Sequence, residues 1–177
     1  DSLLHHHFGS KQGLWQEAAD SEFAPLVARL QDQIEMLASQ GDAANTLRQN
    51  LPLALKLMMT NPAVLQFLFR EGEGDSERSE YLRATYVRPY LARLDELFTQ
   101  GVAAGQLRPL QSVIRHALVM GTMRSLVIPG VLQAELSPHL SSPEALSNYI
   151  DEAASTLYAG FSHTSFHSMP SDSGDQA

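Results

Sequence analysis

Histidines are the side chains whose spacing could most directly do chemistry in this chain. His5, His6 and His7 are adjacent, and His163 and His167 are four residues apart, the spacing of neighbours on one helix face. Imidazole is a common metal ligand, but adjacent positions on a helix point about 100° apart, so the three together cannot chelate one ion. The second pair lies among small polar residues that cannot fold alone. We therefore expect no metal site.

Motifs for catalysis are also absent from the sequence. It contains no Gly-rich phosphate loop after a strand, no His-Glu-x-x-His and no Gly-x-Ser-x-Gly, the patterns that hold a phosphate, a zinc ion or a nucleophilic serine. It contains no cysteine, which excludes disulfides and thiolate chemistry. Scattered Ser, His and Asp residues give no reason to select a catalytic trio. We expect a protein that is not an enzyme and that needs no cofactor.

The first fifteen residues predict a helix, a tight turn and a second helix. Leu4 and Phe8 are four apart and share a helix face. Gly9 supplies the open backbone that ends a helix, and Ser10 is a good cap for the next one. Lys11 then lies in the first turn of that helix, where unpaired backbone N–H groups and the positive end of the dipole help to hold a phosphate.

This stretch resembles the close of the helix-turn-helix in TetR-type bacterial transcriptional regulators, usually written Leu-Tyr-x-His-Phe-x-Ser-Lys-x-x-Leu. The pattern is matched in order at Leu4, His7, Phe8, Ser10, Lys11 and Leu14. His5 stands where the family usually has a Tyr that touches a DNA phosphate. Because the pattern continues through the histidines, a purification-tag remnant is the weaker explanation for them. The resemblance implies further helices upstream and DNA contacts from Ser2, His5, His6 and Lys11.

Charge limits where DNA could bind. The net charge is −8 at neutral pH, so the chain as a whole repels nucleic acid and any DNA contact needs a local basic surface. In the family, the upstream helices often carry several Lys and Arg, whereas Lys11 is the cation of this stretch. We expect residues 1–177 by themselves to bind DNA poorly.

Length and composition predict one globular, cytoplasmic unit. The chain has 177 residues, of which 44% are hydrophobic and 18% charged, the balance of a folded protein with one sizeable core. No apolar run approaches the ~20 residues that span a bilayer, so no membrane partner is expected. The lack of cysteine fits a reducing compartment.

Apolar residues recur at helical spacing along almost the whole chain, which predicts an all-α fold. Pro25 and Pro89 should bend two long helices, and the short helix after Pro62 is apolar almost all round and should be buried. Helices are expected over residues 12–39, 43–59, 62–70, 77–104 and 110–128 and from 143 onward. The resemblance divides the chain into a helix-turn-helix remnant (1–24) and a TetR-type helical regulatory domain (25–162), and small polar residues with Pro and Gly predict a flexible tail (163–177).

The last two helices carry more apolar surface than one neighbour can cover. In helix 110–128, Arg115, His116 and Arg124 are the ionic or titratable exceptions. Unsatisfied apolar faces favour a symmetric homodimer, and the resemblance implies the same pairing as a four-helix bundle. A larger core within one chain is the alternative. The residues predicted at the dimer interface are Ala117, Gly121, Ser125, Ile150, Ala154, Leu157, Tyr158 and Phe161.

A ligand pocket is predicted inside the helical body, where apolar and amphipathic side chains meet. Its candidate residues are Met58, Met59, Phe67, Tyr86, Tyr90, His116 and Met120. The resulting hypothesis is a ligand-responsive, DNA-binding transcriptional regulator, a repressor released from double-stranded operator DNA by a small, mostly apolar effector. The alternative is a helical dimerisation or protein-interaction module that binds no effector.

Overall fold

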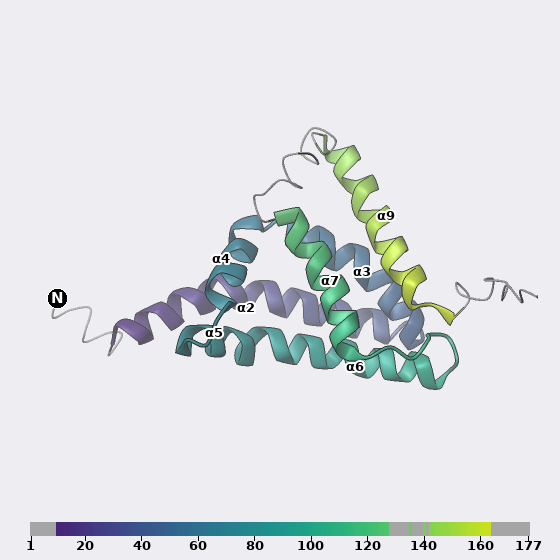
Figure 1. Ribbon diagram of the computed structural model, residues 1–177, viewed down its shortest axis with the longest axis horizontal. Helices are drawn as coiled ribbons and strands as arrows, with labels where there is room; N and C mark the ends of the chain where they lie inside the picture. Colours follow the sequence, from purple (N-terminus) through teal and green to yellow (C-terminus); the bar gives the residue numbers. More distant parts are fainter. Residues whose placement is uncertain (1–9, 128–134, 136–139, 141, 164–177) are drawn as a thin grey trace, which may run out of the picture.

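The computed structural model describes residues 10–127, 135, 140 and 142–163 and is helical over them (Figure 1). An isolated antiparallel bridge joins Leu107 to Ser162. The all-α prediction is therefore confirmed for the described residues. The helices are α2 (Lys11–Ala38), α3 (Ala43–Met59), α4 (Pro62–Gly72), α5 (Glu77–Leu82), the π-helical segment η1 (Arg83–Val87), α6 (Arg88–Ala103), α7 (Ser112–Val127) and α9 (Pro143–Phe161).

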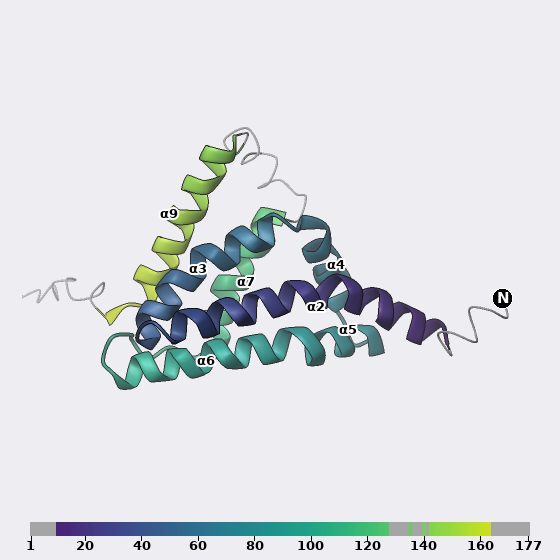
Figure 2. The same ribbon diagram turned by 180° about the vertical axis from the view of Figure 1, so that it is seen from behind.

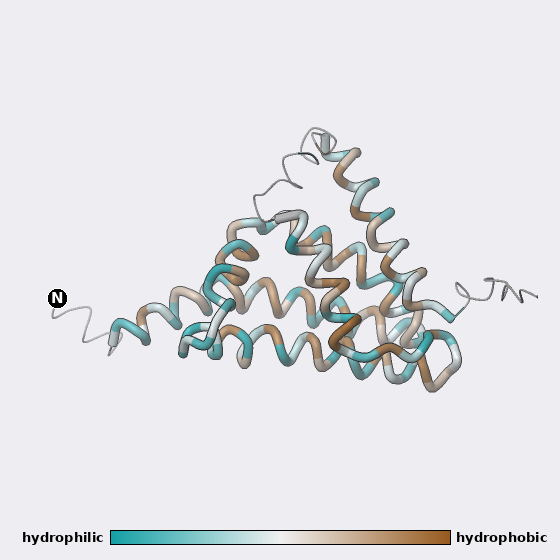
Figure 3. Tube along the Cα trace, in the orientation of Figure 1, coloured by the Kyte–Doolittle hydropathy of each residue, from teal (hydrophilic) through white to brown (hydrophobic). Residues whose placement is uncertain are grey.

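Helix α2 is a single long helix that begins at the predicted cap. The Ser10 hydroxyl accepts a hydrogen bond from the Gly13 N–H at 3.0 Å. The helix continues through Pro25 and across the predicted boundary at residue 24. It runs with α6 along the long axis of the molecule, and an ion pair between Glu35 and Arg93 joins the two helices at 2.7 Å. Hydrophobic and hydrophilic residues alternate along both helices (Figure 3).

Helix α3 is the centre of the packing, with α2, α6 and α9 around it (Figure 2). Its apolar face meets the buried side chains Ile34 of α2 and Leu97 of α6 in one core. Asn50 is also buried there, and its amide is satisfied by Gln33 and Tyr90. Within the described residues no single helix is long and apolar enough to cross a membrane; α3 and α4 meet that criterion only as a pair bent by 91°.

The helix predicted over 77–104 contains a π-helical segment, η1, where the sequence predicted a bend. Proline lacks the N–H that an α-helix needs, and its ring clashes with the carbonyl four residues earlier. Pro89 follows this segment closely, and the Arg88 N–H bonds to the Arg83 carbonyl, five residues back. The wider turn accommodates the proline without ending the helix. Gly105, at a φ of +72°, then ends α6.

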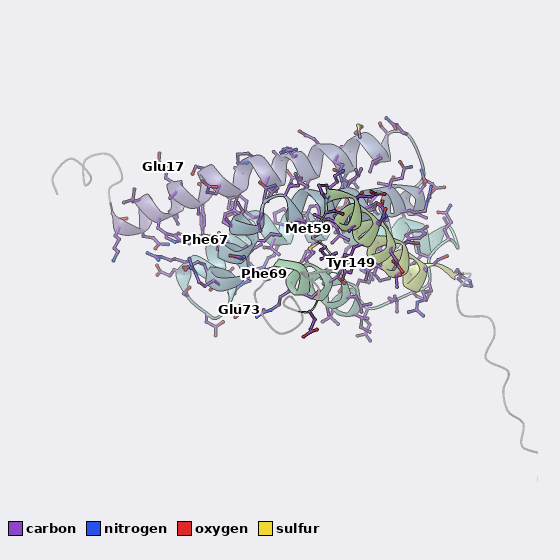
Figure 4. All side chains as sticks on the ribbon, turned by 90° about the horizontal axis from the view of Figure 1, so that it is seen from above. Glu17, Met59, Phe67, Phe69, Glu73 and Tyr149 are labelled. Atoms are coloured by element: carbon purple, nitrogen blue, oxygen red, sulfur yellow. The ribbon has the colours of Figure 1, made fainter. Side chains whose placement is uncertain are left out.

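Helix α4 corrects the prediction of a buried short helix. Leu65 is its one buried side chain, whereas Phe67, Leu68 and Phe69 are half-buried. The helix lies at the surface, with Phe67 next to the first half of α2 and Phe69 further toward α7 (Figure 4). Its apolar residues therefore cover one side of the core and remain partly exposed to solvent.

Helices α7 and α9 are covered to different extents. The Ser142 hydroxyl caps α9 through the Ala145 N–H at 3.1 Å, and α9 rests on α3. Among the α7 side chains that the structure describes, Val119 and Met123 alone are buried. Val113, Ile114 and Leu118 of the same helix are exposed in the single chain, so its own neighbours leave part of its apolar surface uncovered.

Candidate effector cavity

A small cavity, here called the apolar cavity, lies between α2, α3, α4, η1, α6 and α7. Its volume is about 60 Å³. Phe23 from α2 and Met58 from α3 form part of its wall, and Phe69, Met120 and Met123 close it from α4 and α7. Methionine side chains are flexible and adapt to different shapes. The cavity therefore has walls that can repack around an apolar guest.

A second cavity of about 40 Å³, here called the polar-ended cavity, adjoins the first. Leu91, Leu94 and Val119 line both. Leu91 and Leu94 are one turn apart on α6, and Val119 faces them from α7. The two cavities are therefore separated by apolar side chains that belong to both walls.

Three polar side chains, Asp95, Arg115 and His116, lie together in the wall of the polar-ended cavity. Asp95 Oδ1 accepts hydrogen bonds from the Arg115 guanidinium and from His116 Nε2, the latter at 3.1 Å. Arg115 also donates to the Leu110 carbonyl, and its guanidinium lies 4.2 Å from the centre of the Phe98 ring. The opposite charges of Asp95 and Arg115 cancel, and these contacts fix the position of both side chains.

A hydrogen bond from Tyr86 joins η1 to α2, two of the segments that form the wall of the apolar cavity. Its hydroxyl donates a short hydrogen bond to the Asp20 carboxylate, which also accepts from the Tyr81 hydroxyl at 2.7 Å. Burial, together with the nearby carboxylate, raises the pKa of Tyr86 above its usual value. The hydrogen bond to Asp20 raises the pKa of Tyr81 in the same way. Both phenols therefore stay protonated and act as donors.

Tyr90, which also lines the apolar cavity, belongs to a buried network of hydrogen-bonded polar side chains. Gln33 donates to Asn50 Oδ1 at 2.8 Å, and Asn50 Nδ2 donates to the Tyr90 oxygen at 3.4 Å. Burial raises the pKa of Tyr90, so it stays neutral. This hydrogen-bond network orients the Tyr90 ring in the cavity wall without adding a charge to the cavity.

Five of the seven predicted pocket residues line one of the two cavities. Met58, Tyr86, Tyr90 and Met120 line the apolar cavity, and His116 lines the polar-ended one. Two lie elsewhere. Met59 packs half-buried at the edge of the core, and Phe67 lines an open groove between α2 and α4 together with Trp15.

Asp95 and Arg115 are site residues that the sequence analysis did not select. The available signal was that Arg115 and His116 interrupt an otherwise apolar helix. Their partner lies on another helix, 20 and 21 positions away in sequence, so spacing could not identify it.

The residues predicted to contact DNA are described only in part. Lys11 is exposed in the first turn of α2. Ser2, His5 and His6 lie outside the described residues.

The predicted interface residues fall into two groups. Ala117 and Gly121 are exposed on α7, and Ser125 is half-buried beside them. On α9, Leu157 and Tyr158 are half-buried. Ile150, Ala154 and Phe161 are buried within their own chain, so they are already covered without a partner.

The exposed part of α7 forms one continuous strip, here called the outer face of α7. Val113, Ile114 and Leu118 are 65%, 44% and 45% exposed. Ala117 and Gly121 lie among them at helical spacing, and a Cβ added at Gly121 would meet no atom within 4 Å. Large apolar side chains around small ones leave a surface on which a second helix can pack closely.

Comparison with known proteins found no protein-family model that matches the chain and no curated protein similar to it.

Proposed function

We propose that this chain is the effector-binding and dimerising body of a TetR-type transcriptional regulator, a repressor that leaves operator DNA when a small, mostly apolar effector binds. One observation carries the proposal. Helix α2, which begins with Lys11 at the end of the helix-turn-helix-like motif, also supplies Phe23 and Leu26 to the wall of the apolar cavity. A single helix thus connects the expected DNA-contacting end to the cavity.

The small volume of the apolar cavity supports a movement of α2 that is coupled to effector binding. Pockets for small molecules measure about 300–1,000 Å³, whereas the apolar cavity measures about 60 Å³. An effector larger than a small fragment therefore enters only if the walls move apart. Because α2 is one of these walls, the ligand favours an arrangement in which α2 is displaced. DNA affinity then changes by the preference of the ligand for that arrangement.

The outer face of α7 supports assembly as a dimer. Val113, Ile114 and Leu118 expose apolar surface that another copy can bury twice through a two-fold axis. A dimer would present two copies of Lys11, each at the start of an α2 helix. Two recognition helices held in this way bind half-sites about one DNA turn apart, or a multiple of that distance.

The test begins with selection of bound sequences from a random duplex library by the full natural polypeptide. The affinity for a selected duplex is then measured over a range of salt concentrations. Lys11→Ala removes one phosphate-binding cation from each chain, so it is expected to weaken binding to all sequences and to reduce the salt slope by about one for each phosphate no longer neutralised. Lys56→Ala, at an exposed position of α3, is the matched control and should change neither.

Failure to select any sequence would refute the DNA-binding role. If the protein dimerises but neither binds DNA nor responds to apolar compounds, the dimerisation module without an effector is the better interpretation. Full affinity and an unchanged salt slope in Lys11→Ala would refute the role given to that residue alone.

A further inference from the structure

We infer that the effector is an elongated apolar molecule with one uncharged hydrogen-bond donor, such as a hydroxyl, at its end. This inference rests on the proposed function, because it names the class of molecule that the two cavities would take. The apolar body would occupy the apolar cavity. The donor would meet Asp95 in the wall of the polar-ended cavity.

The shape of the ligand follows from the shared wall. Leu91, Leu94 and Val119 line both cavities, so moving these side chains apart joins the two into one elongated space. Leu91 and Leu94 are half-buried, and leucine changes rotamer without moving the backbone. A long, narrow molecule fills that space, whereas a compact one leaves one cavity empty.

The donor follows from the hydrogen bonds of Asp95. Both the Arg115 and the His116 bonds end on Oδ1, and neither uses Oδ2. A carboxylate can accept on both oxygens. A ligand hydroxyl can therefore donate to Oδ2 while the ion pair stays intact.

The lack of charge on the ligand follows from the pairing of Asp95 with Arg115. Their charges cancel, so a charged head group gains little attraction and still loses its hydration on entering. A neutral hydroxyl has a smaller desolvation cost and makes a hydrogen bond to a charged acceptor.

Three eight-carbon probes test the head group on the natural chain. They are 1-octanol, its isomer heptyl methyl ether, which lacks the donor, and octanoate, which carries a charge. Dissociation constants come from the dependence of the unfolding temperature on probe concentration. We expect 1-octanol to bind roughly tenfold to a hundredfold more tightly than the ether, the effect of one hydrogen bond to a charged acceptor, and octanoate to bind most weakly.

Two substitutions test the residues. Asp95→Asn replaces one carboxylate oxygen by a donor and should bring the octanol-to-ether ratio close to one. Glu96→Gln makes the same chemical change at the next residue, which is exposed and lines neither cavity, and should leave the ratio unchanged. Leu94→Phe places a larger side chain between the two cavities and should weaken the binding of 1-octanol at least tenfold. Leu53→Phe, at an exposed site on α3, should leave that binding unchanged.

The outcomes separate this inference from the proposed function. If the ether binds as tightly as 1-octanol to the natural chain, the cavity takes apolar effectors but the donor is refuted. A ratio that persists in Asp95→Asn refutes the role of that carboxylate. Equal effects of Leu94→Phe and Leu53→Phe refute the joined cavity. If no probe binds at all, the effector role itself fails, and this inference fails with it.

Discussion

The hydrogen bond from Tyr86 to Asp20 predicts a measurable loss of stability in Tyr86→Phe. The substitution removes only the hydroxyl, so the ring still packs against Phe23, 5.3 Å away between ring centres. A hydrogen bond to a charged group contributes about 1.5–3 kcal/mol. Asp20 keeps its bond from Tyr81 and is half-buried, so water can replace part of the missing interaction. We expect the free energy of unfolding to fall by about 1–2 kcal/mol.

Urea unfolding at a fixed protein concentration measures this loss, because the stability of a dimer depends on concentration. Tyr149→Phe is the matched control. Tyr149 is half-buried on α9 (Figure 4), and its hydroxyl makes no hydrogen bond within the part of the chain that the structure describes. The control should change stability by less than about 0.5 kcal/mol. If Tyr86→Phe loses no more than Tyr149→Phe, Tyr86 does not hold α2 to the cavity wall.

Two further predictions concern assembly and pH. Leu118→Glu on the outer face of α7 should weaken dimerisation by about 3 kcal/mol, more than a hundredfold in the dissociation constant, because it buries a charge at the interface. In sedimentation velocity this variant should be monomeric. The control Leu53→Glu, at a similarly exposed site on α3, should remain dimeric. Equal masses for the two variants would contradict this interface. The raised pKa of Tyr86 and of Tyr81 gives these two groups a contribution to stability that is constant below the unfolded tyrosine pKa of about 10 and falls above it, because the unfolded chain then loses its protons first. Urea unfolding at pH 8 and pH 10.5 should show this fall, and Tyr86→Phe should reduce it; a fall of the same size in the variant would refute the assignment.

Local sequence signals predicted most of the helices. Caps act within one turn, so Ser10 and Ser142 could be identified from their neighbours alone, and both side chains accept the expected backbone N–H. Pro89 predicted a bend in the helix that contains it. The π-helical form of that bend depends on how the surrounding turns are held by packing, which the local sequence does not specify.

The tertiary contacts of the site could not be predicted from the sequence. The Asp95 contacts join residues on α6 and α7, and helical periodicity does not give the rotation of one helix against another. Periodicity also identifies an apolar surface without saying what covers it. For this reason α4 was expected to be buried and is not, and Phe161 was assigned to a partner although its own chain covers it.

The central claim is that filling the cavity releases DNA, and fluorescence anisotropy of a labelled, selected duplex tests it most directly. The duplex is titrated with the full natural polypeptide at constant salt, first alone and then with 1-octanol at a concentration that saturates its thermal shift. We predict at least a fivefold loss of DNA affinity with 1-octanol, within the usual range of coupling between two sites. An unchanged affinity while the cavity is demonstrably occupied would contradict the claim.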